Sequence, residues 1–103
     1  MDIQMKKGLL DVCVLACLDR GDSYGYQLIA DLSSVIEVSE STLYPILKRL
    51  ESAGLLTTYS REYAGRLRRY YRITREGRRR IDAFNDEWRE MERIQRFIRG
   101  ERR

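Results

Sequence analysis

The spacing of apolar residues changes twice along this chain, and that change constrains its fold more than any other feature. Before residue 54 and after Thr74, apolar side chains recur every three or four positions, which is typical of helices. Between residues 55 and 73 the period is two, which predicts a strand over 55–61, a turn at residues 63–65 and a strand over 66–73. A chain of 103 residues forms one small core. We therefore predict a mainly α (α+β) fold of helices that carries a single hairpin.

Four helices are predicted around the hairpin. They span 5–19, 24–32 with Ser23 as the N-cap, a segment that follows Ser39 or Ser41 and stops at Gly54, and Thr74 to Arg99. The first helix is apolar on nearly every side, so a second subunit or a distant part of the chain must cover it. Gly25 is expected to let another backbone approach closely, and Pro45 is expected near the start of its helix, where a missing N–H costs least.

The third helix separates into two faces. Leu43, Ile46, Leu47 and Leu50 point inward, which leaves polar and aromatic residues outside. Hydroxyl groups and a lysine suit the edges of bases and the phosphates of a duplex. The predicted DNA-binding residues of this outer face are Ser41, Thr42, Tyr44, Pro45 and Lys48.

Positive charge is concentrated on the hairpin and just after it. Residues 61–80 contain nine arginines and two glutamates, a net charge of +7, whereas residues 1–60 carry a net charge of −3 and residues 81–103 none. Such a block predicts a polyanionic partner. The hairpin residues expected to contact DNA phosphates are Arg61, Arg66, Arg68 and Arg69. Four further arginines (75, 78, 79 and 80) oppose the dipole of the last helix, which suggests an external anion, although Glu76 offsets part of this charge.

The last helix carries a heptad-like seam that needs a partner. With the apolar side of the first helix, this seam gives the predicted dimer interface: Leu9, Leu10, Cys13, Ile81, Phe84, Trp88, Met91 and Ile98.

Several classes of function are excluded by what the chain lacks. It has no histidine and no glycine-rich segment for phosphates, so we predict no enzymatic activity, no cofactor and no metal. Cys13 and Cys17 are expected to be buried, reduced packing thiols because their spacing is not that of a redox or zinc motif. No membrane-spanning stretch or secretory signal is apparent, which predicts a cytoplasmic location without membrane contact.

Three segments resemble PadR-like transcriptional regulators: residues 39–56 (SESTLYPILKRLESAGLL), residues 65–77 (GRLRRYYRITREG), and Gly8-Leu-Leu followed by Tyr24-Gly-Tyr-Gln-Leu-Ile29. The resemblance implies a homodimeric winged helix-turn-helix repressor with a DNA-binding domain over 1–73 and a dimerisation helix over 74–103. A single helix after the wing resembles the small subfamily. In some of its members planar hydrophobic drugs bind at the dimer interface against a tryptophan, whose position Trp88 matches.

Sequence and resemblance together predict a sequence-specific DNA-binding transcriptional regulator that binds a pseudo-palindromic operator as a dimer. Its two reading helices would enter major grooves about 34 Å apart. Two alternatives stay open: a sensor that binds a planar hydrophobic molecule near Trp88, and a winged-helix module that binds acidic protein surfaces. Trp88 is also explained as an ordinary aromatic residue of a dimer seam.

Overall fold

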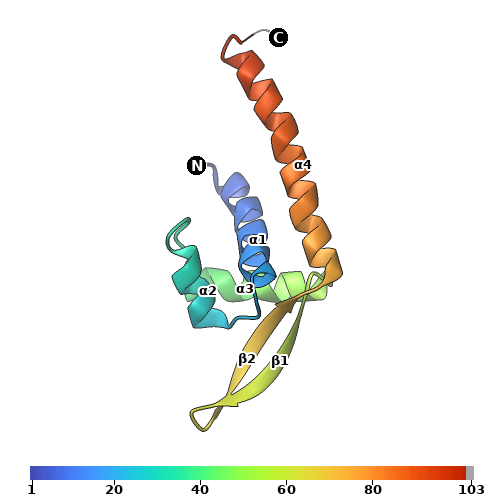
Figure 1. Ribbon diagram of the computed structural model, residues 1–103. Helices are drawn as coiled ribbons and strands as arrows, with labels where there is room; N and C mark the ends of the chain where they lie inside the picture. The colour runs from blue at the N-terminus through green and yellow to red at the C-terminus, as the bar shows by residue number, and fades with distance from the viewer. Residues whose placement is uncertain (102–103) are drawn as a thin grey trace.

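Four helices and a two-stranded antiparallel hairpin make up the fold (Figure 1). The computed structural model describes residues 1–101. Its elements are α1 (Ile3–Asp19), α2 (Gly25–Leu32), α3 (Glu40–Ser52), β1 (Leu56–Tyr63), β2 (Arg66–Ile73) and α4 (Arg75–Ile98). This order confirms the predicted mainly α winged helix-turn-helix with its two-stranded wing. The last two residues of the predicted segment 74–103 lie outside the described part.

The core lies where α1, α2 and α3 meet the base of the wing. Val14 and Leu15 of α1, Leu28 of α2 and Leu43 of α3 are completely buried. Each such side chain contributes about 1.5–3 kcal/mol relative to an exposed position. Leu56 and Ile73 of the wing, together with the adjacent Tyr71, join the same cluster, which attaches the hairpin to the helices.

A tight turn sets the register of the wing. The strands pair from Leu56 with Ile73 at the base to Tyr63 with Arg66 at the tip. Only Ala64 and Gly65 connect them, and both have positive φ angles, 53° and 78°. Two left-handed residues match a type I′ turn, whose twist suits a hairpin. Strand β1 therefore extends through Tyr63, which the sequence placed in the turn.

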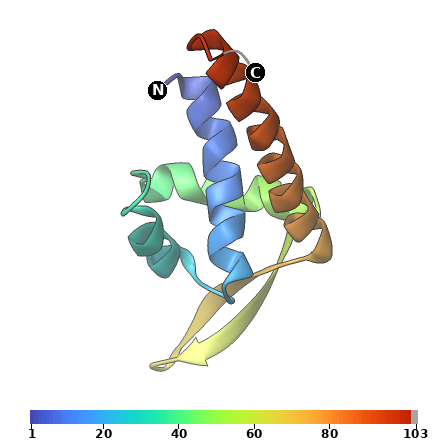
Figure 2. The same cartoon turned by 45° about the horizontal axis from the view of Figure 1, so that its top comes forward.

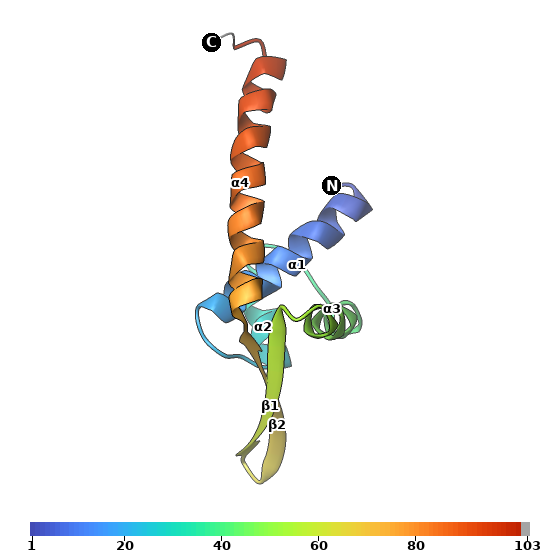
Figure 3. The same cartoon turned by 90° about the vertical axis from the view of Figure 1, so that its right-hand side faces the viewer.

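Helix α4 and the wing extend from the core in opposite directions (Figures 1 and 3). The 24 residues of α4 span about 36 Å. The first half of α4 lies beside α1 (Figure 2), and the second half of α4 extends beyond α1. Thr74 caps α4 as predicted: its Oγ1 accepts the N–H of Gly77 at 3.1 Å and donates to the carbonyl of Gly54 at 2.7 Å.

Two expectations are wrong: the N-cap of α2 and the position of Pro45 in α3. Ser23 does not cap α2; Tyr24 is the N-cap and makes no side-chain cap hydrogen bond. Ser23 is instead buried, and its backbone N–H and carbonyl pair with Tyr71 of β2 at 3.2 and 2.8 Å. Pro45 is the sixth residue of α3, past the first turn, so it withholds the N–H that the carbonyl of Ser41 would otherwise accept.

The coverage of α1 follows one of the two predicted alternatives, a distant part of the chain. Helix α4 and strand β2, both distant in sequence, pack on α1 together with α2 and α3, and much of its apolar surface is buried within the single chain. Leu10 is 2% exposed, so it belongs to the core and is removed from the predicted dimer interface. Cys13 and Cys17 are free thiols that are half-buried rather than buried, and partial burial raises the pKa of both.

Candidate nucleic-acid interface

The outer face of α3 is formed as the sequence predicts. Leu43, Ile46, Leu47 and Leu50 point into the core, so the intervening positions face outward. All five predicted residues of this surface are exposed, and we call them the reading face: Ser41, Thr42, Tyr44, Pro45 and Lys48.

Hydroxyl groups cluster at the amino-terminal end of the reading face. Ser39 is the N-cap of α3, but its side chain makes no cap hydrogen bond. Its Oγ lies 3.0 Å from Oγ of Ser41 and donates to Oγ1 of Thr42 at 3.2 Å. These exposed hydroxyls can rotate to donate to or accept from a base edge or a phosphate oxygen.

Tyr44 rests against the start of α2. A Cβ built on Gly25 would lie 2.1 Å from the hydroxyl oxygen of Tyr44, so only glycine leaves room for this ring. The close neighbour that Gly25 admits is thus a side chain rather than the backbone that we expected. Tyr44 remains 43% exposed, so α2 positions its ring while one face stays accessible.

The two faces of the wing use their arginines differently. On one face, the guanidinium of Arg61 lies 5.5 Å from the ring centre of Tyr70, and Arg68 lies between two further tyrosine rings. On the other face, Arg69 donates to Oγ1 of Thr58 at 3.3 Å. Arg66 lies at the tip, directly after the turn, and is exposed.

Two residues of the reading face, Tyr44 and Lys48, and the wing line one concave surface, which we call the α3–wing groove. It has a volume of about 590 Å³ between α2, α3 and the wing tip, and it continues past Tyr44 and Arg69 to Lys48. Arg66, Arg68 and Arg69 supply its positive charge. Four tyrosines that the sequence did not predict complete its lining: Tyr24, Tyr26, Tyr63 and Tyr71. The Tyr-Gly-Tyr run at the start of α2 was a signal for the first two.

Acidic partners within the chain occupy some of the arginines at the start of α4. Arg78 Nε lies 2.9 Å from Asp19 Oδ1 at the end of α1, and Arg79 pairs with Glu76. These pairs offset much of the unfavourable charge at the helix start. Two of the four arginines that suggested an external anion are therefore paired within the chain.

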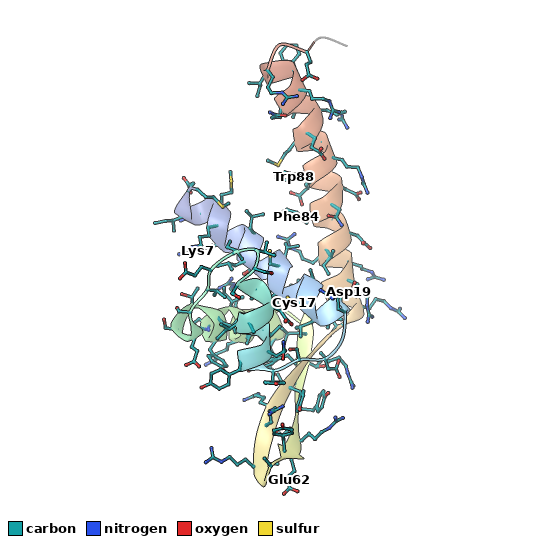
Figure 4. The ribbon with its side chains drawn as sticks, turned by 60° about the vertical axis from the view of Figure 1, so that its left-hand side comes forward. Lys7, Cys17, Asp19, Glu62, Phe84 and Trp88 are labelled. Carbon is teal, nitrogen blue, oxygen red and sulfur yellow. The ribbon has the colours of Figure 1, made fainter. Side chains whose placement is uncertain are left out.

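The predicted interface residues of α4 are spread along its length. Ile81 packs against the core, whereas Trp88, Met91 and Ile98 are 45%, 49% and 75% exposed. Phe84 and Trp88 stack with ring centres 6.1 Å apart and point to the side on which α1 lies (Figure 4). Leu9 and Cys13 of α1 are half-buried.

These features define a winged helix-turn-helix protein: a three-helix core, a reading face on its third helix and an arginine-rich hairpin beside it. Residues 14–83 match the family described as Transcriptional regulator PadR-like family. The chain belongs to the PadR-like family of transcriptional regulators, as its sequence motifs predicted. Members of this family are DNA-binding transcriptional regulators rather than enzymes.

Relatives of known name and structure agree with this assignment. The transcriptional regulator Rv3488 of Mycobacterium tuberculosis is 44% identical over 63 residues, which cover 61% of this chain and 56% of that protein. A PadR family transcription regulator from Clostridium difficile R20291 has a TM-score of 0.79 and 30% identity, covering 87% of this chain and 97% of that one. A PadR family transcriptional regulator from Eggerthella lenta DSM 2243 has a TM-score of 0.83 and 32% identity, covering 95% and 88%.

None of the helices within residues 1–101 is long and apolar enough to cross a lipid bilayer.

Proposed function

We propose that this protein is a homodimeric repressor that binds a pseudo-palindromic operator in a sequence-specific manner. One observation carries the proposal: two residues of the reading face, Tyr44 and Lys48, line the same groove as three arginines of the wing, Arg66, Arg68 and Arg69. A helix at this position fits the major groove, which is about 12 Å wide, while the wing follows the adjacent backbone. Such a regulator acts on chromosomal DNA, so we place it in the cytoplasm.

Dimerisation would join the two reading faces into one recognition unit. We assign residues 1–73 to DNA binding and residues 74–103 to dimerisation, as in the small subfamily with one helix after the wing. The exposed seam on α4 and the half-buried Leu9 and Cys13 on α1 support this division. A second copy packed there would cover apolar side chains that the single chain leaves open to water.

A mobility-shift titration tests this proposal. The probe is the DNA immediately upstream of the protein's own coding sequence, with unrelated DNA as competitor. If each subunit neutralises about four phosphates, log K falls with log salt with a slope of roughly −7. Complexes that the competitor removes completely, or a slope near zero, would refute specific recognition.

Substitutions locate the contact. Lys48→Ala on the reading face should weaken binding and reduce the size of the salt slope by about 2, one for each subunit, if the lysine contacts a phosphate. Lys7→Ala is the matched control, since Lys7 is an equally charged, exposed residue on α1 rather than in the α3–wing groove (Figure 4). Equal losses in both variants would mean that only net charge matters.

A second function is favoured by the aromatic pair on α4. Trp88 is 45% exposed and stacked at 20° on Phe84, which offers a flat apolar surface to a planar hydrophobic molecule. Because Trp88 is the single tryptophan of the chain, its fluorescence reports binding directly. Quenching by planar cationic dyes would support an effector site, and unchanged emission across a panel of such dyes would reject it.

A further inference from the structure

Arg68 differs from Arg66 and Arg69 of the wing in its contacts and its burial. The guanidinium carbon of Arg68 lies 3.9 Å from the ring centre of Tyr24 and 3.7 Å from that of Tyr63. Arg68 is half-buried, whereas Arg66 and Arg69 are exposed. At these distances both aromatic rings make close cation–π contacts with the guanidinium.

The edge of this guanidinium is also engaged. Arg68 Nη1 donates to the hydroxyl of Tyr70 at 3.3 Å, and the ring of Tyr70 meets that of Tyr24 edge-on with ring centres 5.7 Å apart. A phosphate contact needs N–H groups on the guanidinium edge that point to solvent. Three tyrosines of the same chain thus contact the Arg68 guanidinium, two through their rings and one through its hydroxyl.

The residues around Arg68 connect the wing to the helices. Tyr63 is the last residue of β1, at the wing tip, and Tyr24 is the N-cap of α2. Gly25, the next residue, is the position against which Tyr44 of the reading face rests. Arg68 therefore links the outer half of the wing to the segment that also positions Tyr44.

The loop between α1 and α2 holds the wing at a second point. Asp22 Oδ2 accepts hydrogen bonds from the hydroxyl of Tyr59 at 2.7 Å and from Arg72 Nε at 3.0 Å. Core packing reaches only the base of the wing, because residues 60–67 are all exposed. The Asp22 contacts therefore hold the inner half, and the contacts of Arg68 with Tyr24 and Tyr63 extend this support to the outer half.

We infer that Arg68 is a positioning residue, which fixes the wing relative to α3 through its stack between Tyr24 and Tyr63 and does not bind phosphate. The inference rests on the proposed DNA-binding function for its consequence, although the stack itself can be observed without DNA. It revises the expectation from the sequence, which placed Arg68 among the phosphate contacts.

DNA binding by charge-conserving variants separates the two roles. Arg68→Lys keeps the positive charge but loses the flat guanidinium that both rings contact, so we expect operator affinity to fall about tenfold. Tyr63→Leu should cause a similar loss, and the double variant should be no worse than either single one, since both remove the same stack. Arg20→Lys is the matched control, since Arg20 is an exposed arginine outside the α3–wing groove, and we expect its affinity within about twofold of the wild type. Arg68→Lys with wild-type affinity, or fully additive losses in the double variant, would overturn the inference.

A measurement without DNA keeps the test independent of the proposed function. Ring currents from Tyr24 and Tyr63 should move the Cδ protons of Arg68 upfield in the NMR spectrum of the wild type. Tyr63→Leu should reduce this shift and increase the motion of the Ala64 and Gly65 amides, whereas Arg66→Lys should change neither. Unshifted Arg68 protons, or unchanged motion of the turn in Tyr63→Leu, would refute the positioning role even if DNA binds. Shifted protons in a protein that binds no DNA would refute the proposed function alone.

Discussion

Replacing Gly77 with alanine tests the packing at the base of α4 because two effects of opposite sign compete there. Helix propensity favours alanine by up to about 1 kcal/mol. The structure opposes it, since a Cβ at this position would lie 2.3 Å from the carbonyl oxygen of Leu55 and 2.6 Å from Cγ1 of Ile73. The carbonyl of Leu55 is fixed because it accepts the N–H of Thr74 at 3.1 Å. Overpacking costs typically 1–3 kcal/mol, and a backbone neighbour implies the upper end. We therefore expect a net loss of about 2 kcal/mol.

Thermal unfolding followed by circular dichroism measures this loss. For a chain of this size about 2 kcal/mol corresponds to a Tm lower by roughly 10 °C. All samples need the same protein concentration, since subunit association shifts the apparent Tm. Gly8→Ala in α1 is the control: no heavy atom lies within 4 Å of its Cβ, so we expect a gain of up to about 1 kcal/mol. A Gly77→Ala protein as stable as the wild type would refute the packing argument.

Three further substitutions have defined outcomes. Gly25→Ala should displace the Tyr44 ring and lower operator affinity about tenfold. If ring displacement is the cause, the double variant Gly25→Ala, Tyr44→Leu should bind the operator no more weakly than Tyr44→Leu alone. Ala64→Gly relieves a left-handed residue (φ 53°) and should raise the free energy of unfolding by about 0.5–1 kcal/mol, and a loss in chemical denaturation would contradict this reading. Hydrogen bonds from Arg72 and Tyr59 hold the pKa of Asp22 below its ordinary value. The stability that these bonds give to the folded protein is therefore complete above about pH 4 and is lost as the pH falls through the lowered pKa. Asp22→Asn should therefore cost up to about 1 kcal/mol at neutral pH and nothing in acid, and a pH-independent difference between the two proteins would exclude this cause.

Much of the fold could be predicted from local patterns. The switch from a helical period to a period of two located the wing, and the Leu43, Ile46, Leu47 and Leu50 stripe separated the buried face of α3 from its exposed one. Thr74 was found as a cap because hydroxyl side chains accept from helix N–H groups within three residues. Each of these signals depends only on residues that are close in sequence.

Part of the candidate site followed from the same local rules. The five residues of the reading face are exposed as expected because helical geometry alone assigns them to one side. What each wing arginine contacts could not be deduced in this way. Arg68 and Arg69 are adjacent in sequence and both line the groove. Arg68 nevertheless contacts the rings of Tyr24 and Tyr63, whereas Arg69 donates to the hydroxyl of Thr58.

The sequence by itself determined the secondary structure, the exposed face of α3 and the concentration of charge on the hairpin, since all three depend on short-range periodicity and composition. Only the tertiary structure decided that Ser23 pairs with β2 instead of capping α2, that Leu10 is buried, and that Gly25 makes room for Tyr44. The contacts of Gly25 with Tyr44 and of Ser23 with Tyr71 join residues 19 and 48 positions apart in the chain. Such contacts arise from packing in three dimensions, and no local pattern in the sequence encodes them.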